Sequence, residues 1–231
     1  MQLGVYRHEK KFIIGHDKAA RLQEELALLL ETDPYSANGY YSVRSLYFDS
    51  INERDYYEKL AGDYLRRKIR LRVYTPEDKT AKLEIKEKRG DLQHKQSLIV
   101  DREQARLLCQ GDYFFLGDMD SELARRLYLM MTLKSYRPAA LIEYDRRAFV
   151  YQEFDTRITF DTAVKSSETE QDIFEKEPLY NSILADRVVL EVKYNGKLFK
   201  PISGVLKKYG ITNTSYSKYS NGRRVIKGGE Y

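Results

Sequence analysis

The stretch LRRKIRLRVY, residues 65–74, decides the fold, because charged and apolar side chains alternate along it with a period of two. Its even positions are all basic: Arg66, Lys68, Arg70 and Arg72. Its odd positions are mainly apolar: Leu65, Arg67, Ile69, Leu71 and Val73. Such alternation is typical of a β-strand with one buried face and one polar face. We therefore expect a strand over 65–74 that carries a basic face.

The same alternation recurs in other segments of the chain. The segment AKLEIKEKR, residues 81–89, places four charged residues on one face: Lys82, Glu84, Lys86 and Lys88. Near the N-terminus, Arg7, Glu9 and Lys11 alternate in the same way. Glu191 and Lys193 alternate with apolar residues in segment 187–194. Several strands are therefore expected to contribute to a common charged surface.

Two interpretations of this charged surface remain open. Alternating charge usually marks a strand face in water, whereas a curled sheet would turn its charged faces inward. Four like charges along one face repel one another, and carboxylates lie among the cations at Glu9, Glu84 and Glu191. Arginine matches phosphate well because its planar group donates two parallel hydrogen bonds. The pattern therefore favours a lining that binds a polyanion.

The expected elements define the fold class. Strands are predicted over eight segments: 6–14, 43–49, 65–74, 81–89, 95–100, 139–151, 156–161 and 187–194. Helices are predicted over 17–30, from about 101, over 121–133 and over 202–208. These elements indicate an α+β protein with a mostly antiparallel sheet, as a closed barrel or a sandwich. No composition shift marks a boundary, so a single domain over 1–231 is expected.

Composition excludes several classes of protein. The chain has 40 Lys and Arg and 35 Asp and Glu, which gives a net charge of +5 and suggests anionic partners. One cysteine and three scattered histidines cannot form a disulfide or a thiolate zinc site. No apolar run could span a membrane, no secretory signal opens the chain, and no P-loop or Rossmann motif occurs. We expect a soluble, cytoplasmic protein.

The carboxylates within the basic rows suggest a metal. Phosphoryl transfer uses a divalent cation, and Mg²⁺ and Mn²⁺ prefer oxygen ligands from one or two carboxylates, phosphates and water. Glu9, Glu84 and Glu191 are the candidates. The alternative for each is a salt bridge to a neighbouring cation.

Eight short motifs occur in a recognisable order. They are RHEKKF (7–12), SLYFD (45–49), IRLRVY (69–74), LEIKEK (83–88), EYDRRAF (143–149), TRITFDT (156–162), LEVKY (190–194) and SKY (217–219). In these motifs the chain resembles, over about residues 6–223, the catalytic domain of the vacuolar transporter chaperone (VTC) polyphosphate polymerases. That family lies within the CYTH-like superfamily of triphosphate tunnel metalloenzymes. The resemblance implies an eight-stranded antiparallel barrel, with helices packed outside, that forms a tunnel.

The resemblance also implies an activity and its partners. The family transfers the γ-phosphate of ATP to a growing inorganic polyphosphate chain, releases ADP and depends on Mn²⁺ or Mg²⁺. ATP and polyphosphate are therefore the expected partners, and no nucleic acid is expected. In the eukaryotic family this domain accompanies membrane spans, which this chain lacks. A separately encoded membrane partner is thus expected.

The family motifs assign roles to individual residues. The phosphate-binding set is Lys11, Arg70, Arg72, Lys86, Lys95, Arg146, Arg157 and Lys218, with Lys68 and Lys193 added from the charged faces. Glu191 matches the metal-binding glutamate, and Glu9 and Glu84 are secondary candidates. The catalytic set is Arg70, Arg72, Glu191 and Lys218. Because Lys10 lies beside Lys11, the register of the first strand stays open. Alternation places Arg146 on the same face as Ile142 and Tyr144, so its assignment rests on the family motif alone.

Two departures from related sequences bear on function. The CYTH triphosphatases carry an ExExK signature on their first strand, where this chain has Arg7 in place of the first Glu. This change favours a polymerase over a two-metal hydrolase. The polymerase family often has a lysine where this chain has Ser215, which removes one expected contact to the chain.

Two alternatives to the polymerase stay open. One is a triphosphatase that hydrolyses inorganic or nucleoside triphosphates. The other is a module that binds polyphosphate or an inositol phosphate without turnover. An RNA-binding role has no recognisable signature in the chain.

Overall fold

The computed structural model describes residues 7–90 and 92–228, so Tyr6, where the first strand was expected to begin, lies outside the described residues. The chain forms two compact units, each assembled from three separate segments. Unit 1 consists of residues 1–42, 144–164 and 182–217, and unit 2 consists of residues 43–143, 165–181 and 218–231.

The sheet follows the expected α+β class. Its strands are β1 (Arg7–Gly15), β2 (Glu31–Thr32), β3 (Tyr41–Ser50), β4 (Leu65–Val73), β5 (Thr80–Arg89), β6 (Leu92–Asp101), β7 (Tyr136–Tyr151), β8 (Thr156–Ser167), β9 (Asn181–Leu184) and β10 (Arg187–Asn195). Eight of them form the hydrogen-bonded path β1-β10-β8-β7-β3-β4-β5-β6, with β2 on β7 and β9 on β8. The pairs β1–β10, β10–β8, β3–β4, β4–β5 and β5–β6 are antiparallel. The α+β prediction is confirmed.

The sheet is not closed, which corrects the expectation of a barrel. Among the residues that the structure describes, no pairing joins the two ends of the path, β1 and β6. At β1 the outward backbone groups of Lys11 have other partners, because its N–H donates to Asn213 Oδ1 at 3.1 Å and its carbonyl accepts from Thr214 N at 2.7 Å. Strand β6 presents exposed polar side chains such as His94 and Lys95, which discourage further pairing at an edge.

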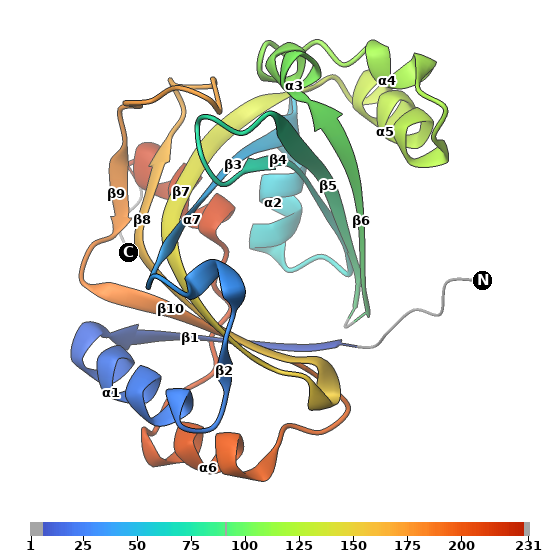
Figure 1. Ribbon diagram of the computed structural model, residues 1–231. Helices are drawn as coiled ribbons and strands as arrows, with labels where there is room; N and C mark the ends of the chain where they lie inside the picture. The colour runs from blue at the N-terminus through green and yellow to red at the C-terminus, as the bar shows by residue number, and fades with distance from the viewer. Residues whose placement is uncertain (1–6, 91, 229–231) are drawn as a thin grey trace. The chain divides into compact units, whose positions relative to one another are not determined.

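In unit 1, helices α1 (His16–Ala27) and α6 (Lys200–Lys208) lie side by side, as Figure 1 shows. Leu22 and Leu26 of α1 and Ile202 of α6 are fully buried. They pack with apolar residues of β1, β8 and β10, among them Leu190 and Phe160. This packing covers the apolar faces of these strands, so their charged side chains lie on the opposite face.

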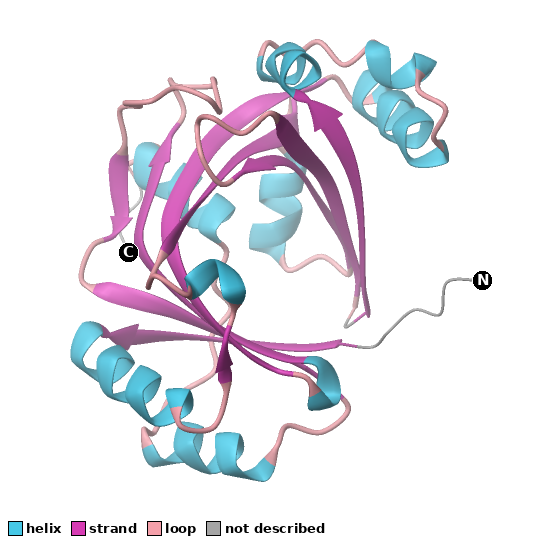
Figure 2. Cartoon of the chain, viewed as in Figure 1, coloured by secondary structure: helices cyan, strands magenta, loops and turns pink. Residues whose placement is uncertain are grey.

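In unit 2, helices α3 (Arg102–Cys109), α4 (Phe115–Asp118) and α5 (Glu122–Leu133) gather near the ends of β5 and β6 (Figures 1 and 2). Asp101 and Gln104 form a capping box at the start of α3. Leu108 and Leu127 share a core with Leu83 of β5. The helices predicted from about 101 and over 121–133 are therefore confirmed.

Unit 2 also contains two helices that no apolar pattern predicted, α2 (Arg54–Ala61) and α7 (Lys218–Ile226). Unit 1 also contains two short 3₁₀ turns, at Pro34–Ser36 and Glu153–Asp155. None of the helices in the described part of the chain is long and apolar enough to cross a membrane.

Candidate functional site

Unit 2 carries a basic face on strands β3 to β6. Residues directly opposite in an antiparallel pair share a face. Arg70 of β4 lies opposite Tyr47 of β3 and Glu84 of β5, while Arg72 lies opposite Ser45. The apolar residues between them point the other way, and Leu71 is fully buried. The alternation read from residues 65–74 is therefore present in the structure.

Glu84 lies at the centre of this basic face. Its Oε2 is 2.6 Å from Arg70 Nε and 3.6 Å from Arg72 Nη1, and its Oε1 pairs with Lys95 Nζ. Burial would raise the pKa of Glu84, but Arg70, Arg72 and Lys95 lower it to about 2. In this structure Glu84 therefore forms salt bridges with neighbouring cations, which is the alternative to a metal ligand. That Glu84 binds a metal stays a prediction.

The basic face continues along the strands as rungs of opposed residues. Four successive rungs are Arg72–Lys82, Arg70–Glu84, Lys68–Lys86–Lys95 and Arg66–Lys88. Each rung lies two residues from the next, and a strand advances about 3.4 Å per residue. The row therefore extends over roughly 20 Å, and cations from three adjacent strands share one surface.

Tyr47 is a member of this face that the sequence reasoning missed. Arg70 Nη1 donates to the Tyr47 hydroxyl at 3.1 Å. Burial raises the pKa of Tyr47, but Arg70, Arg72 and Lys218 outweigh burial, so the net shift is downward. Lys218, the first residue of α7, is therefore close enough to act on the same hydroxyl. The motif SLYFD contained Tyr47, but nothing in its spacing assigned a role.

Unit 1 carries a second charged face on β1, β10 and β8. Lys11 lies opposite Glu191, which lies opposite Thr159. Glu9 lies opposite Lys193, which lies opposite Arg157. Lys10 instead lies opposite Val192 on the apolar side. This register decides between the two lysines and places Lys11 on the charged face.

The carboxylates of Glu191 and Glu9 on this face each pair with a lysine. Lys193 Nζ lies 2.7 Å from Glu191 Oε1, and Lys11 Nζ lies 3.2 Å from Glu9 Oε1. Burial lowers the pKa of Lys193, and Glu191 and Glu9 oppose this shift without cancelling it. A partly buried cation whose charge is penalised in this way gains most from a further anion.

The oxygen atoms near Glu191 suit a hard cation. Glu191 and Glu9 supply carboxylates, and Thr159 Oγ1 is buried without a hydrogen-bond partner among the described residues. No group of three or more Asp, Glu, His or Cys gathers within the described ranges. A set of two carboxylates fits a metal that takes its other ligands from phosphate oxygens and water.

Two arginines of unit 1 are held by carboxylates. Arg146 Nε and Nη2 form a bidentate pair with Asp161 at 2.6 and 2.8 Å. Asp161 shares a strand face with Thr159 and Arg157, so this pair directs Arg146 to the charged face. Arg157 Nη2 lies 3.0 Å from Asp33 and donates to the Tyr41 hydroxyl at 3.1 Å. Asp161 and Asp33 were not predicted as partners, because both lie far from these arginines in sequence.

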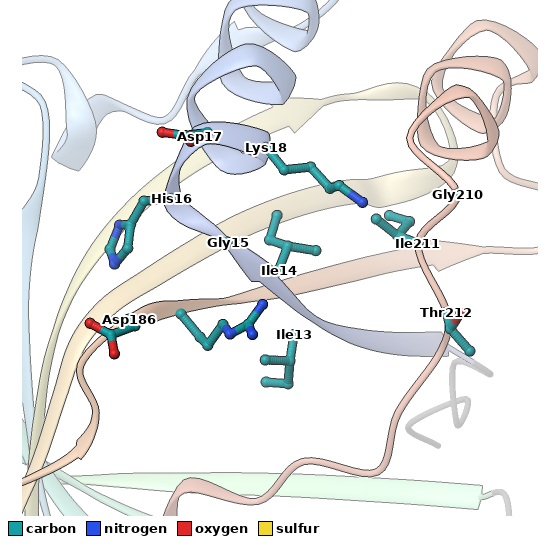
Figure 3. Close-up of a pocket in the computed structure, with 11 residues that line it drawn as sticks. Ile13, Ile14, Gly15, His16, Asp17, Lys18, Asp186, Gly210, Ile211 and Thr212 are labelled. Atoms are coloured by element: carbon teal, nitrogen blue, oxygen red, sulfur yellow. The ribbon is translucent and has the colours of Figure 1, made fainter.

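A hollow of about 630 Å³ lies elsewhere in unit 1. It is lined at the start of α1 by His16, Asp17 and Lys18, and across from them by Asp186 and Thr212 (Figure 3). Among the residues that the structure describes, those that line this hollow include no residue that the sequence predicted for the site. The residues that the sequence predicted for the site therefore do not form this hollow.

Comparison with known proteins identifies the family. The VTC domain model matches residues 6–227, nearly the whole chain. The chain belongs to the VTC domain family. The eight sequence motifs that indicated this resemblance lie within the matched part of the VTC domain. None of the curated proteins matches the chain.

Comparison with solved structures finds candidate adenylate cyclases among the matches. One from Bacillus halodurans is 13% identical, covers 92% of this chain and 95% of its own, and has a TM-score of 0.56. Another, from Vibrio parahaemolyticus, is 10% identical, covers 95% of this chain and 98% of its own, and has a TM-score of 0.49. At this identity the likeness of the first structure to the VTC domain concerns the fold alone.

Proposed function

We propose that this VTC domain is a metal-dependent polyphosphate polymerase that transfers the γ-phosphate of ATP to a growing polyphosphate chain. The observation that carries the proposal is the length of the basic face in unit 2. Its four rungs place cations over roughly 20 Å of strand, from Arg72 to Arg66. A single triphosphate occupies only part of such a row, whereas a polymer of phosphate uses all of it.

The cations supply positioning and charge neutralisation. Arg70 and Arg72 present planar groups that bind phosphate with two hydrogen bonds each. Glu84 reduces repulsion between them and holds their side chains in place before substrate arrives. Preorganised donors of this kind stabilise the charge that develops on the transferred phosphoryl group. Lys218, which is electrostatically coupled to Tyr47, adds a further cation.

The reaction needs no protein nucleophile. A terminal oxygen of the bound chain attacks the γ-phosphorus, a P–O bond forms, and the bond from that phosphorus to the β–γ bridging oxygen breaks. ADP leaves with the electron pair, and the chain is one phosphate longer. Positioning of the two reactants is the main contribution of the protein to this step.

Glu191 and Glu9 are the residues that would hold a divalent cation, Mn²⁺ or Mg²⁺. When bound, the ion offsets negative charge on the phosphate oxygens. Lys11 and Lys193 hold these carboxylates on the charged face of unit 1. ATP and inorganic polyphosphate are the substrates in this proposal, which places the protein in the cytoplasm, where it would meet a separately encoded membrane partner.

The test is incubation of the purified protein with ATP and Mn²⁺, with products separated by gel and ADP measured enzymatically. Long polyphosphate formed together with ADP is the expected result. Orthophosphate without chains would contradict the proposal and indicate a triphosphatase. Salt-sensitive binding of polyphosphate without consumption of ATP would also contradict it and indicate a binding module.

A further inference from the structure

We infer that Tyr219 and Asp49 are positioning residues that hold Lys218 beside Tyr47 and Arg70. The inference rests on the proposed function, because it concerns the placement of a phosphate-binding lysine. Asp49 is the last residue of the motif SLYFD and Tyr219 the last residue of the motif SKY, and the sequence assigned no role to either.

Asp49 is the fixed point of the arrangement. It is 1% exposed, and it occupies an odd position of β3, on the same face as Tyr47. Its Oδ1 accepts from the N–H groups of Ser50 and Asp55 at 2.8 and 2.9 Å. Its Oδ2 accepts from Tyr56 N at 3.0 Å. Asp49 thereby ties the start of α2 to the end of β3, and its position is set by the backbone.

Tyr219 binds to this fixed point from α7. Its hydroxyl donates to Asp49 Oδ2 at 2.6 Å, and its side chain is 1% exposed. Its ring stacks on Tyr47, with centroids 5.1 Å apart and planes 19° apart, and meets the edge of Tyr56. Because Tyr47 in turn accepts from Arg70, Tyr219 connects the first turn of α7 to the basic face.

The rest of α7 is attached independently. Arg223 pairs with Glu53 and Glu168, and Lys227, which directly follows the helix, also pairs with Glu53. These contacts lie one turn or more beyond Tyr219. Loss of the Tyr219 hydroxyl therefore leaves α7 attached and loosens only the turn that begins with Lys218. A lysine has a long flexible side chain, so the position of its ammonium depends on such an anchor.

The experiment is a double-mutant cycle read by the affinity for inorganic tripolyphosphate, which requires no turnover. The wild type, Tyr219→Phe, Lys218→Ala and the double variant are compared by calorimetry. We expect Tyr219→Phe to weaken affinity about tenfold in the wild-type background and by less than twofold once Lys218 is alanine. In the polymerase assay the same pattern is expected in kcat.

Tyr136→Phe is the matched control. Tyr136 is also buried, and its hydroxyl donates to the buried carboxylate of Asp55 at 2.9 Å. This variant makes the same chemical change without touching α7, so it should leave tripolyphosphate affinity unchanged. Thermal melts of all variants verify folding. If Tyr219→Phe does not fold, Asp49→Asn, which keeps one acceptor oxygen, takes its place in the cycle.

Two results would overturn the inference: equal losses from Tyr219→Phe in both backgrounds, or an unchanged affinity in Lys218→Ala. Failure of the proposed function is distinguishable from both. It would appear as absence of polyphosphate synthesis by the wild type, while the binding cycle still reports on Lys218.

Discussion

Glu84 illustrates how a single residue can set the chemistry of a surface. A net charge of +5 over 231 residues describes only a mildly basic protein. Around Glu84, however, Arg70, Arg72 and Lys95 converge on one carboxylate, and Lys86 lies opposite Lys95. Local excess of positive charge, rather than the net charge, is what a polyanion experiences.

Loss of both arginines at this point should weaken phosphate binding. We expect Arg70→Ala combined with Arg72→Ala to cost about 3 kcal/mol or more in tripolyphosphate affinity, since each charge-assisted hydrogen bond contributes about 1.5–3 kcal/mol. Calorimetry measures the change, and Arg106→Ala, which removes an arginine paired with Glu103 on α3, is the control. Unchanged affinity in the double variant would show that this face binds no phosphate.

Glu191 should matter for turnover more than for binding. We expect Glu191→Gln to abolish metal-dependent turnover while ATP binding is partly retained, because the amide keeps the size of the side chain and loses the charge that attracts a cation. Rates at increasing Mn²⁺ and binding of ATP are the two measurements. Glu103→Gln serves as control, and full activity of Glu191→Gln would remove this residue from the metal role.

At the scale of elements, the sequence predicted strands well and polar helices poorly. The strand expected over 65–74 is β4, Leu65–Val73, because an apolar row every second residue identifies a buried face. Helix α2 was missed because its buried residues are Asp55, Tyr56 and Glu58, so no apolar period marks it. Helix α7 was missed because Asn221 and Gly222 lower its helix propensity.

The capping box of α3 offers a prediction about stability. Asp101 Oδ1 accepts from Gln104 N at 2.8 Å, and Gln104 Oε1 accepts from Asp101 N at 3.1 Å. We expect Asp101→Ala to reduce the free energy of unfolding by about 1 kcal/mol. Urea unfolding measures the loss, and Asp101→Asn, which retains an acceptor, should show a smaller one. Equal stability of Asp101→Ala and wild type would contradict this role.

At the scale of the whole molecule, the candidate site was predicted in part. Membership of each charged face follows from alternation, so Arg70 and Glu191 could be placed from sequence, whereas the choice between Lys10 and Lys11 needed the strand register. The side chains that each charged residue contacts could not be predicted, because these contacts depend on which strands become neighbours in the sheet. Tyr219 and Asp49 are 170 residues apart, and no local pattern relates them.

The stability of the protein should depend on pH through Asp55. Burial, and then the charge of Asp49, raise the pKa of Asp55 from 3.8 to about 7. The folded state therefore favours the protonated form, and this stabilisation is complete below about pH 3.8 and is lost as the pH rises through 7. We expect the unfolding free energy of the wild type, relative to Asp55→Asn, to fall between pH 5 and pH 8, by at most about 1.4 kcal/mol per pH unit. Urea titrations at several pH values measure this slope, with the exposed Asp120→Asn as control; parallel curves for wild type and Asp55→Asn would contradict it.

The two hydrogen bonds that the Asn213 side chain and the Thr214 N–H make with the backbone of Lys11 have a consequence for the protein in a crowded solution. An uncovered edge strand can accept a strand from another molecule and so begin an aggregate. At Lys11 the donor and the acceptor are already used within the chain. The same two bonds hold β1 against sliding by one residue, a shift that would exchange Lys11 for Lys10 on the charged face.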